Sequence, residues 1–157
     1  MTADALLTPA QRAFLVGART IVLATIAPDG RPRLLPICFV VGEAERPLVI
    51  HTPLDEKRKS VADPRHLERV TDILARPAVG LLAERWSEDW SEIGWLRLDG
   101  VAVLVEPGPD EHRAGVAALR AKYAQYATHH LEERPIIRIV VERTRGWGVL
   151  GARAGQG

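Results

Sequence analysis

The chain has 157 residues, of which 46% are apolar and 26% are charged, as in an ordinary globular domain rather than a disordered or fibrous protein. Its 21 basic and 20 acidic residues are mixed along the chain and give a net charge of +1. No summed field would attract DNA or an anionic membrane, which argues against a nucleic-acid-binding or membrane-surface protein.

Hydropathy along the chain argues against a membrane span. No run approaches the roughly 18 apolar residues that a spanning helix needs, and the start lacks a basic segment followed by a long apolar stretch. We therefore expect a cytoplasmic protein with a single domain over residues 1–150. The glycine-rich residues 151–157 are expected to form a flexible tail.

The first half of the chain carries clear start and turn signals. Thr8 can cap a helix, and Pro9 suits the first turn of that helix. Turn residues at 28–30 separate two β-rich runs, which predicts a hairpin. Pro53 cannot donate to a continuing ladder and marks the end of a further strand. The predicted elements are a helix over 8–19 and strands over 20–26, 33–41 and 47–52.

The second half continues with strands and two more helices. Arg76-Pro77 ends a helical pattern, Gly100 predicts a bulge or a close approach, and Asp110 can cap a helix. A bend is expected at Gly146. The predicted elements are helices over 67–74 and 110–127, and strands over 78–83, 95–105, 136–141 and 147–150.

This order of elements predicts the fold class. About six short strands are joined mainly by turns, and the helices do not alternate with them as in a Rossmann sheet. A mainly β fold fits better, namely an antiparallel barrel with peripheral helices.

The densest polar cluster is the run Asp55-Glu56-Lys57-Arg58-Lys59, which follows a predicted strand and precedes a helix. Lysines in such a place often bind phosphate together with backbone N–H groups. Alternatively, the two acidic residues balance the lysines and the whole run is a solvated surface. Spacing alone favours the second interpretation.

Three of the four tryptophans, Trp86, Trp90 and Trp95, fall within ten residues. Their rings suit a planar cofactor, but they suit a subunit interface or a core as well, and composition alone favours packing.

The five histidines lack the spacing of a metal site, so we expect no metal. The chain also contains no Gly-x-Ser-x-Gly nucleophile motif and no glycine-rich dinucleotide or phosphate loop. These observations argue against a hydrolase or a nucleoside triphosphatase.

The order of segments resembles the pyridoxamine-phosphate-oxidase-like family, in particular its coenzyme F-420-dependent subgroup. The resemblance covers nearly the whole chain. It rests on residues 24–32, on Leu54-Asp55-Glu56-Lys57-Arg58-Lys59, on Glu88-Asp89-Trp90, on residues 95–100, and on residues 136–147. The lysine segment together with Glu88-Asp89-Trp90 is the most specific part.

The resemblance implies an antiparallel split β-barrel of the FMN-binding type, which forms a homodimer and binds FMN or the deazaflavin F-420 in a groove between subunits. The cofactor would transfer a hydride to or from a small organic substrate. By position, the phosphate ligands would be Lys57, Lys59 and Thr52, Arg33 would lie beside the ring, and Trp90 and Trp147 would contact the ring or the interface.

The chain also departs from the family pattern. Asp72 stands where relatives often have Asn, a change expected to have little functional consequence, and the chain stops soon after Trp147, which makes oxidation of pyridoxamine phosphate doubtful. We assign no catalytic acid or base. Two alternatives stay open: a cofactor-binding module without turnover, and a heme-related protein, for which His51 is the only candidate axial ligand near the expected groove.

Overall fold

The structure, a computed structural model, describes residues 5–55 and 62–150. Its core is one antiparallel sheet of seven strands in the order β2-β1-β5-β6-β7-β4-β3. The elements are α1 (Pro9–Gly17), β1 (Ile21–Ile26), β2 (Pro32–Ile37), β3 (Val40–Val41), β4 (Val49–Pro53), η1 (Pro64–His66), α2 (Glu68–Ala75), β5 (Ala78–Arg85), η2 (Trp90–Glu92), β6 (Gly94–Val105), α3 (Asp110–Lys122), η3 (Ala124–Thr128), η4 (Leu131–Glu133) and β7 (Ile136–Gly148).

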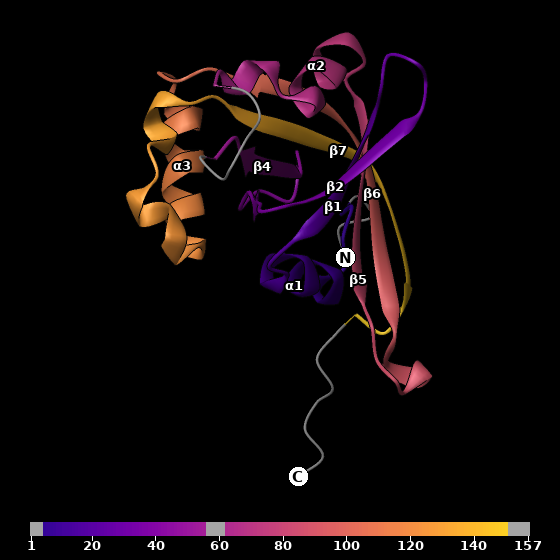
Figure 1. Cartoon of the computed structure of the whole chain (residues 1–157). Coiled ribbons are helices and arrows are strands. Elements are labelled where there is room, and N and C mark those ends of the chain that lie inside the picture. Colours follow the sequence, from indigo (N-terminus) through magenta and orange to yellow (C-terminus); the bar gives the residue numbers. More distant parts are fainter. Residues whose placement is uncertain (1–4, 56–61, 151–157) are drawn as a thin grey trace.

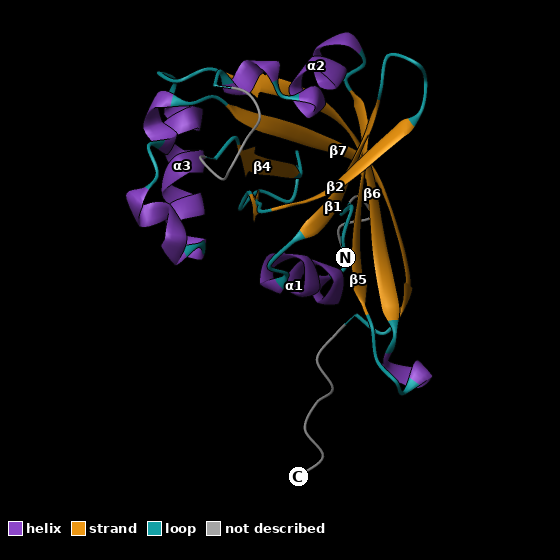
Figure 2. Cartoon of the chain, in the orientation of Figure 1, coloured by secondary structure: helices purple, strands orange, loops and turns teal. Residues whose placement is uncertain are grey.

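The sheet is strongly curled, so that β1 and β2 pass in front of β7 and β4 in Figure 1. Helix α2 crosses the upper end and contacts β1 and β6, whereas α3 lies to the side, against β4 and β7. Figure 2 shows that the long strands β5, β6 and β7 extend beyond the helices to a protruding lower tip, which ends in η2. The predicted split β-barrel with peripheral helices is confirmed.

Strands β6 and β7 pair along their whole length, and the ladder changes register between Asp99 and Gly100. A Cβ atom at Gly100 would lie 2.5 Å from the Val140 carbonyl oxygen, so only glycine fits at this irregularity. The predicted bulge or close approach at Gly100 is confirmed.

The apolar run 33–41, predicted as one strand, is divided in the structure. Strand β2 ends at Ile37, and β3 begins at Val40 and pairs with β4 instead of β1. The backbone N–H of Phe39 donates to the hydroxyl of Tyr123 at 2.9 Å, and that hydroxyl lies 2.9 Å from the Phe39 carbonyl oxygen. Because a distant side chain satisfies the backbone of Phe39, the ladder is interrupted there.

Two predictions for the C-terminal part were wrong. Helix α3 ends at Lys122 rather than 127, and its cap is Pro109, which leaves Asp110 as the first helical residue. Strand β7 continues without a break through Gly146, because β6 is long enough to pair with all of it. A Cβ atom at Gly146 would lie 2.6 Å from Nε2 of Gln11, so this glycine admits α1 rather than a bend.

Two hydrophobic clusters fill the molecule. The larger fills the barrel, with residues such as Leu23 and Leu98, and the smaller lies under α3. Val116, Leu119 and Tyr126 belong to the smaller cluster and are all buried. Within residues 5–55 and 62–150, no helix is long and apolar enough to cross a membrane.

Lys122 lies at the edge of the smaller cluster. Its Nζ atom is buried without a hydrogen-bond partner and lies 4.0 Å from the centroid of the Phe39 ring. Burial lowers the pKa of Lys122 to about 8. A cation over an aromatic face is partly compensated, but burial still favours the neutral amine.

This lysine predicts a pH dependence of stability. Between about pH 8 and pH 10 the unfolded chain keeps the proton that the folded protein has released, so the lysine's contribution to stability rises with pH in this window. The thermal midpoint of the parent minus that of Lys122→Met should therefore become more positive from about pH 7.5 to pH 9.5. Arg113→Met removes a positive charge from the exposed surface of the same helix, and its difference should stay constant. A constant difference for Lys122→Met as well would mean that the folded lysine remains charged.

Candidate functional site at the start of α2

Arg33 is held in a fixed position where β2 faces the start of α2. Its Nε atom lies 3.1 Å from Oδ2 of Asp72, and its Nη1 atom lies 2.5 Å from Oε2 of Glu68. The hydrogen bond to Glu68 raises the pKa of Arg33. About 30% of the Arg33 side chain is exposed. The guanidinium is therefore immobilised and still accessible from outside.

Asp72 positions this arginine from the interior. Its carboxylate is buried, and the hydroxyl of Thr25 donates to Oδ2 at 2.8 Å. The other oxygen, Oδ1, has no hydrogen-bond partner among the described residues. The sequence predicted little consequence for an aspartate at this position. In the structure, however, the charge of Asp72 anchors Arg33, a role that a neutral asparagine would fill only in part.

A cavity of about 260 Å³ opens beside Arg33. Its walls come from β2, the last residue of η1 and the first turn of α2. Basic groups outnumber acidic ones among the residues that line it, which are Arg33, Leu34, Leu35, His66, Leu67, Glu68 and Arg69.

The predicted phosphate ligands Lys57 and Lys59 lie outside the described residues, in the segment between β4 and η1. The third predicted ligand, Thr52, is buried in β4, and its hydroxyl donates to the Cys38 carbonyl oxygen at 2.7 Å. To donate to a phosphate, Thr52 would have to give up this bond. Its role therefore stays a prediction.

The start of the basic run is anchored to the fold. Asp55 is buried, and its Oδ2 atom accepts a hydrogen bond of 2.7 Å from the hydroxyl of Tyr126. Nε of Arg134 donates to the carbonyl oxygen of Leu54 at 2.5 Å. Asp55 is thus not part of a solvated surface, because its carboxylate accepts a hydrogen bond in the interior.

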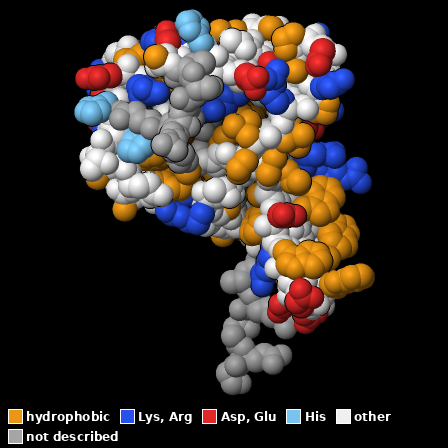
Figure 3. Space-filling model, in the orientation of Figure 1, with side chains coloured by type: hydrophobic (Ala, Val, Ile, Leu, Met, Phe, Trp, Pro, Cys, Tyr) orange, Lys and Arg blue, Asp and Glu red, His pale blue; other side chains and the backbone are white. Residues whose placement is uncertain are grey.

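The predicted aromatic contacts lie at the opposite end of the sheet. Trp90 is 74% exposed and Trp147 is 55% exposed, and Trp86 beside them is exposed too. These three residues form what we call the tryptophan surface, on the protruding tip where hydrophobic side chains gather in Figure 3. Arg33 is paired near the upper end of the sheet, opposite Thr25. One chain therefore does not bring Arg33 and these tryptophans together.

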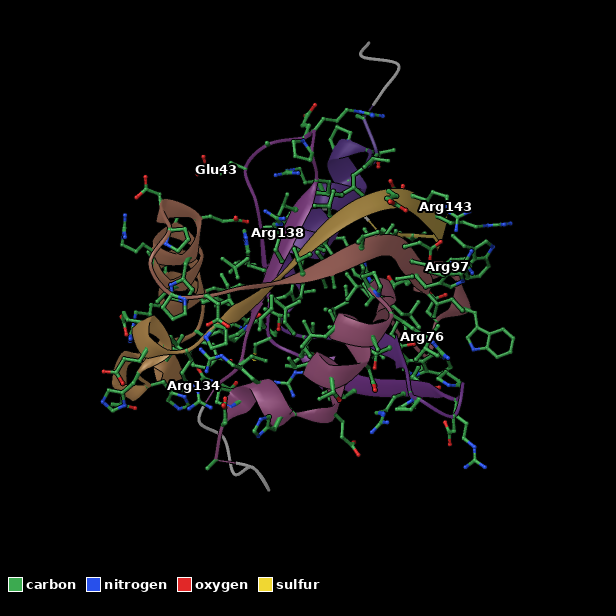
Figure 4. All side chains as sticks on the ribbon, turned by 90° about the horizontal axis from the view of Figure 1, so that it is seen from above. Glu43, Arg76, Arg97, Arg134, Arg138 and Arg143 are labelled. Carbon is green, nitrogen blue, oxygen red and sulfur yellow. The ribbon has the colours of Figure 1, made fainter. Side chains whose placement is uncertain are left out.

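A further charged group was not anticipated from the sequence. Glu111 of α3 lies 3.0 Å from Nε2 of His51 and 3.1 Å from Nη1 of Arg138, and Figure 4 shows Arg138 on the part of β7 beside α3. Nε2 of His51, the nitrogen that most often ligates a metal, is therefore engaged. Among the described residues, no three side chains of the His, Cys, Asp and Glu types gather as a metal site.

Comparisons with known proteins place this geometry in a family context. The sequence model of the pyridoxamine 5'-phosphate oxidase family matches residues 7–148. No curated protein matches the chain. A conserved hypothetical protein from Mycobacterium tuberculosis has a TM-score of 0.69 and 23% identity, over 100% of this chain and 97% of its own.

Two further solved structures share the fold. HutZ, the heme storage protein of Vibrio cholerae, has a TM-score of 0.67 and 16% identity, over 92% of this chain and 96% of its own. An F-420 reductase has a TM-score of 0.62 and 20% identity, over 88% of this chain and 98% of its own. At these identities the likeness shows the fold alone.

The buried bond between Thr25 and Asp72 can be tested by Thr25→Val. Hydrogen bonds to charged groups contribute about 1.5–3 kcal/mol, so the free energy of unfolding should fall by about that amount. Chemical denaturation measures the change. Thr71→Val is the matched control, because the Thr71 hydroxyl is exposed and bonds only the Glu68 carbonyl, and its effect should stay within about 0.5 kcal/mol. Equal effects of the two variants would mean that the buried bond is not strengthened by the charge of Asp72.

Proposed function

The chain belongs to the pyridoxamine 5'-phosphate oxidase family, and on this premise we propose that it is an oxidoreductase using FMN or the deazaflavin coenzyme F-420. The observation that carries the proposal is the immobilised Arg33 beside a cavity at the start of α2. An F-420 reductase with the same fold and the sequence resemblance to the F-420-dependent subgroup support the deazaflavin. The substrate would be a small organic molecule.

The residues near Arg33 fit the two parts of such a cofactor. A phosphate group needs cationic and N–H donors. Arg33 can supply one, and the sequence resemblance implies Lys57 and Lys59 as others. A tricyclic ring needs an apolar surface, and Leu34, next to Arg33, is 63% exposed. Bound in this way, the cofactor supplies hydride transfer, while the protein binds and orients it. We propose no residue as a catalytic acid or base.

We further propose that two copies of the chain form the complete site. The tryptophan surface exposes three large aromatic rings, and Trp and Tyr are enriched at interfaces between subunits. Pairing two copies would cover these rings and could bring Trp90 and Trp147 of one copy to the cofactor of the other. This arrangement accounts for their distance from Arg33 within one chain.

A visible spectrum of the purified protein separates the candidate cofactors. A flavin or deazaflavin absorption band supports the proposal, and turnover with the reduced cofactor distinguishes an enzyme from a binding module. A Soret band would instead indicate heme. Heme ligation through Nε2 of His51 would require this nitrogen to leave Glu111.

The basic run Asp55-Glu56-Lys57-Arg58-Lys59 leads to a prediction about cofactor binding. Loss of a charge-assisted hydrogen bond should raise the dissociation constant for FMN or F-420 by about one to two orders of magnitude in Lys57→Ala, and by a similar or smaller factor in Lys59→Ala. A binding titration of each variant with both cofactors measures this. Arg58→Ala removes the same formal charge and should bind like the parent. If all three variants bind like the parent, the run is only a solvated surface.

The tryptophan surface leads to a prediction about dimer formation. Sedimentation should give twice the mass of one chain, and the double variant Trp90→Asp, Trp147→Asp should sediment as a monomer, because a buried carboxylate without a partner opposes association. Leu74→Asp places the same charge on an exposed apolar side chain of α2 and should leave the dimer intact. A parent that stays monomeric at micromolar concentration would contradict the shared site.

A further inference from the structure

Arg69, in the first turn of α2, carries a buried charge without a partner. The residue is only 9% exposed, its Nε atom has no hydrogen-bond partner, and it forms no ion pair within residues 5–55 and 62–150. Asp72 lies three residues further on the same helix, but its carboxylate bonds Arg33 and Thr25 instead. Nearly all buried polar groups in proteins are paired, so an exception calls for an explanation.

The electrostatics of Arg69 favour a bound anion. Burial lowers the pKa of Arg69, and the attraction of Asp55 opposes this change without a hydrogen bond between the two side chains. An isolated charge in the interior is costly, and an apolar residue of similar size would usually be more stable there. A guanidinium nevertheless occupies this position. A bound anion that supplies the missing negative charge would account for it.

Arg69 lines the same cavity as Arg33 and His66. The N-cap of α2, Leu67, provides no side-chain cap. The N–H groups of Val70 and Thr71 already donate to the Leu67 carbonyl oxygen, which leaves the N–H groups of Glu68 and Arg69 for an anion. Glu68 is the acidic residue in the lining, and its carboxylate is neutralised by Arg33 at 2.5 Å. The volume of about 260 Å³ lies below the roughly 300 Å³ at which pockets for whole ligands begin, which suits one phosphate group but not a tricyclic ring.

We propose that Arg69 and the first turn of α2 bind the phosphate monoester of the cofactor. The identity of the cofactor rests on the proposed function, but the phosphate site itself does not. Arg69 would approach the phosphate from inside the fold, whereas Arg33 approaches it from the rim. The phosphate would thereby supply the negatively charged partner that the guanidinium of Arg69 lacks among the described residues.

The test compares Arg69→Met with the parent in two measurements. Inorganic phosphate, at ionic strength matched with chloride, should raise the thermal midpoint of the parent and leave that of the variant unchanged. In binding titrations the variant should bind FMN about ten- to a hundredfold more weakly, and riboflavin, which lacks the phosphate, as the parent does. Arg69→Lys keeps the charge without the forked geometry and should lie between the two.

Arg65→Met is the matched control, because Arg65 is near in sequence but already paired with Glu106 and Asp63. It should leave both phosphate responses unchanged. The midpoint of ligand-free Arg69→Met in chloride should not fall, since the variant removes an uncompensated charge. If it falls and the phosphate response persists, Arg69 is a structural partner of Asp55 and the proposal is overturned.

The same measurements distinguish this proposal from the proposed function. A phosphate response that depends on Arg69, in a protein that binds neither FMN nor F-420, would keep the anion site and reject the cofactor. Tight FMN binding that Arg69→Met leaves unchanged would keep the cofactor and reject the anion site. A parent whose midpoint does not respond to phosphate would also overturn the site.

Discussion

The antiparallel ladder between β6 and β7 holds the two halves of the sheet together. It runs from Gly94 opposite Gly148 to Val105 opposite Ile136, with β5, β1 and β2 on one side and β4 and β3 on the other. Strand β4 pairs only with the first part of β7, from Val49 opposite Val140 to Pro53 opposite Ile136. The rest of the ladder extends beyond the barrel and carries the tryptophan surface.

Charge is distributed unevenly around the start of α2. Arg33 interacts with two carboxylates, whereas the Nε atom of Arg69, on α2, has no hydrogen-bond partner among residues 5–55 and 62–150. A fold selected only for stability would replace a buried unpaired charge with an apolar side chain. The two arginines line one cavity but differ in their pairing. In our proposal the carboxylates of the protein hold Arg33 in place before a ligand binds, whereas Arg69 forms its ion pair with the ligand.

Predictions from the sequence succeeded where the signal is local. The cap at Thr8 and Pro9 in the first turn correctly predicted α1, and the turn at 28–30 correctly predicted the hairpin of β1 and β2. The predictions from the sequence failed where a residue far along the chain determines the local structure. Strand pairing breaks at Phe39 because of Tyr123, a residue 84 positions later. Propensity within the apolar run gives no sign of such a contact.

The sequence by itself determined which chemical groups are present, among them the basic run at 55–59, the four tryptophans and the aspartate at position 72. The sequence also indicated the family, because each family motif is a continuous stretch of residues. Only the tertiary structure decided which of these groups meet. Thr25, Arg33 and Asp72 come from three elements and form one cluster of hydrogen bonds and ion pairs. Trp90, in contrast, belongs to η2 at the lower tip of the molecule. The physical reason is that residue identity sets charge and hydrogen-bonding capacity, but the pairing of distant strands and helices decides which charges find a partner.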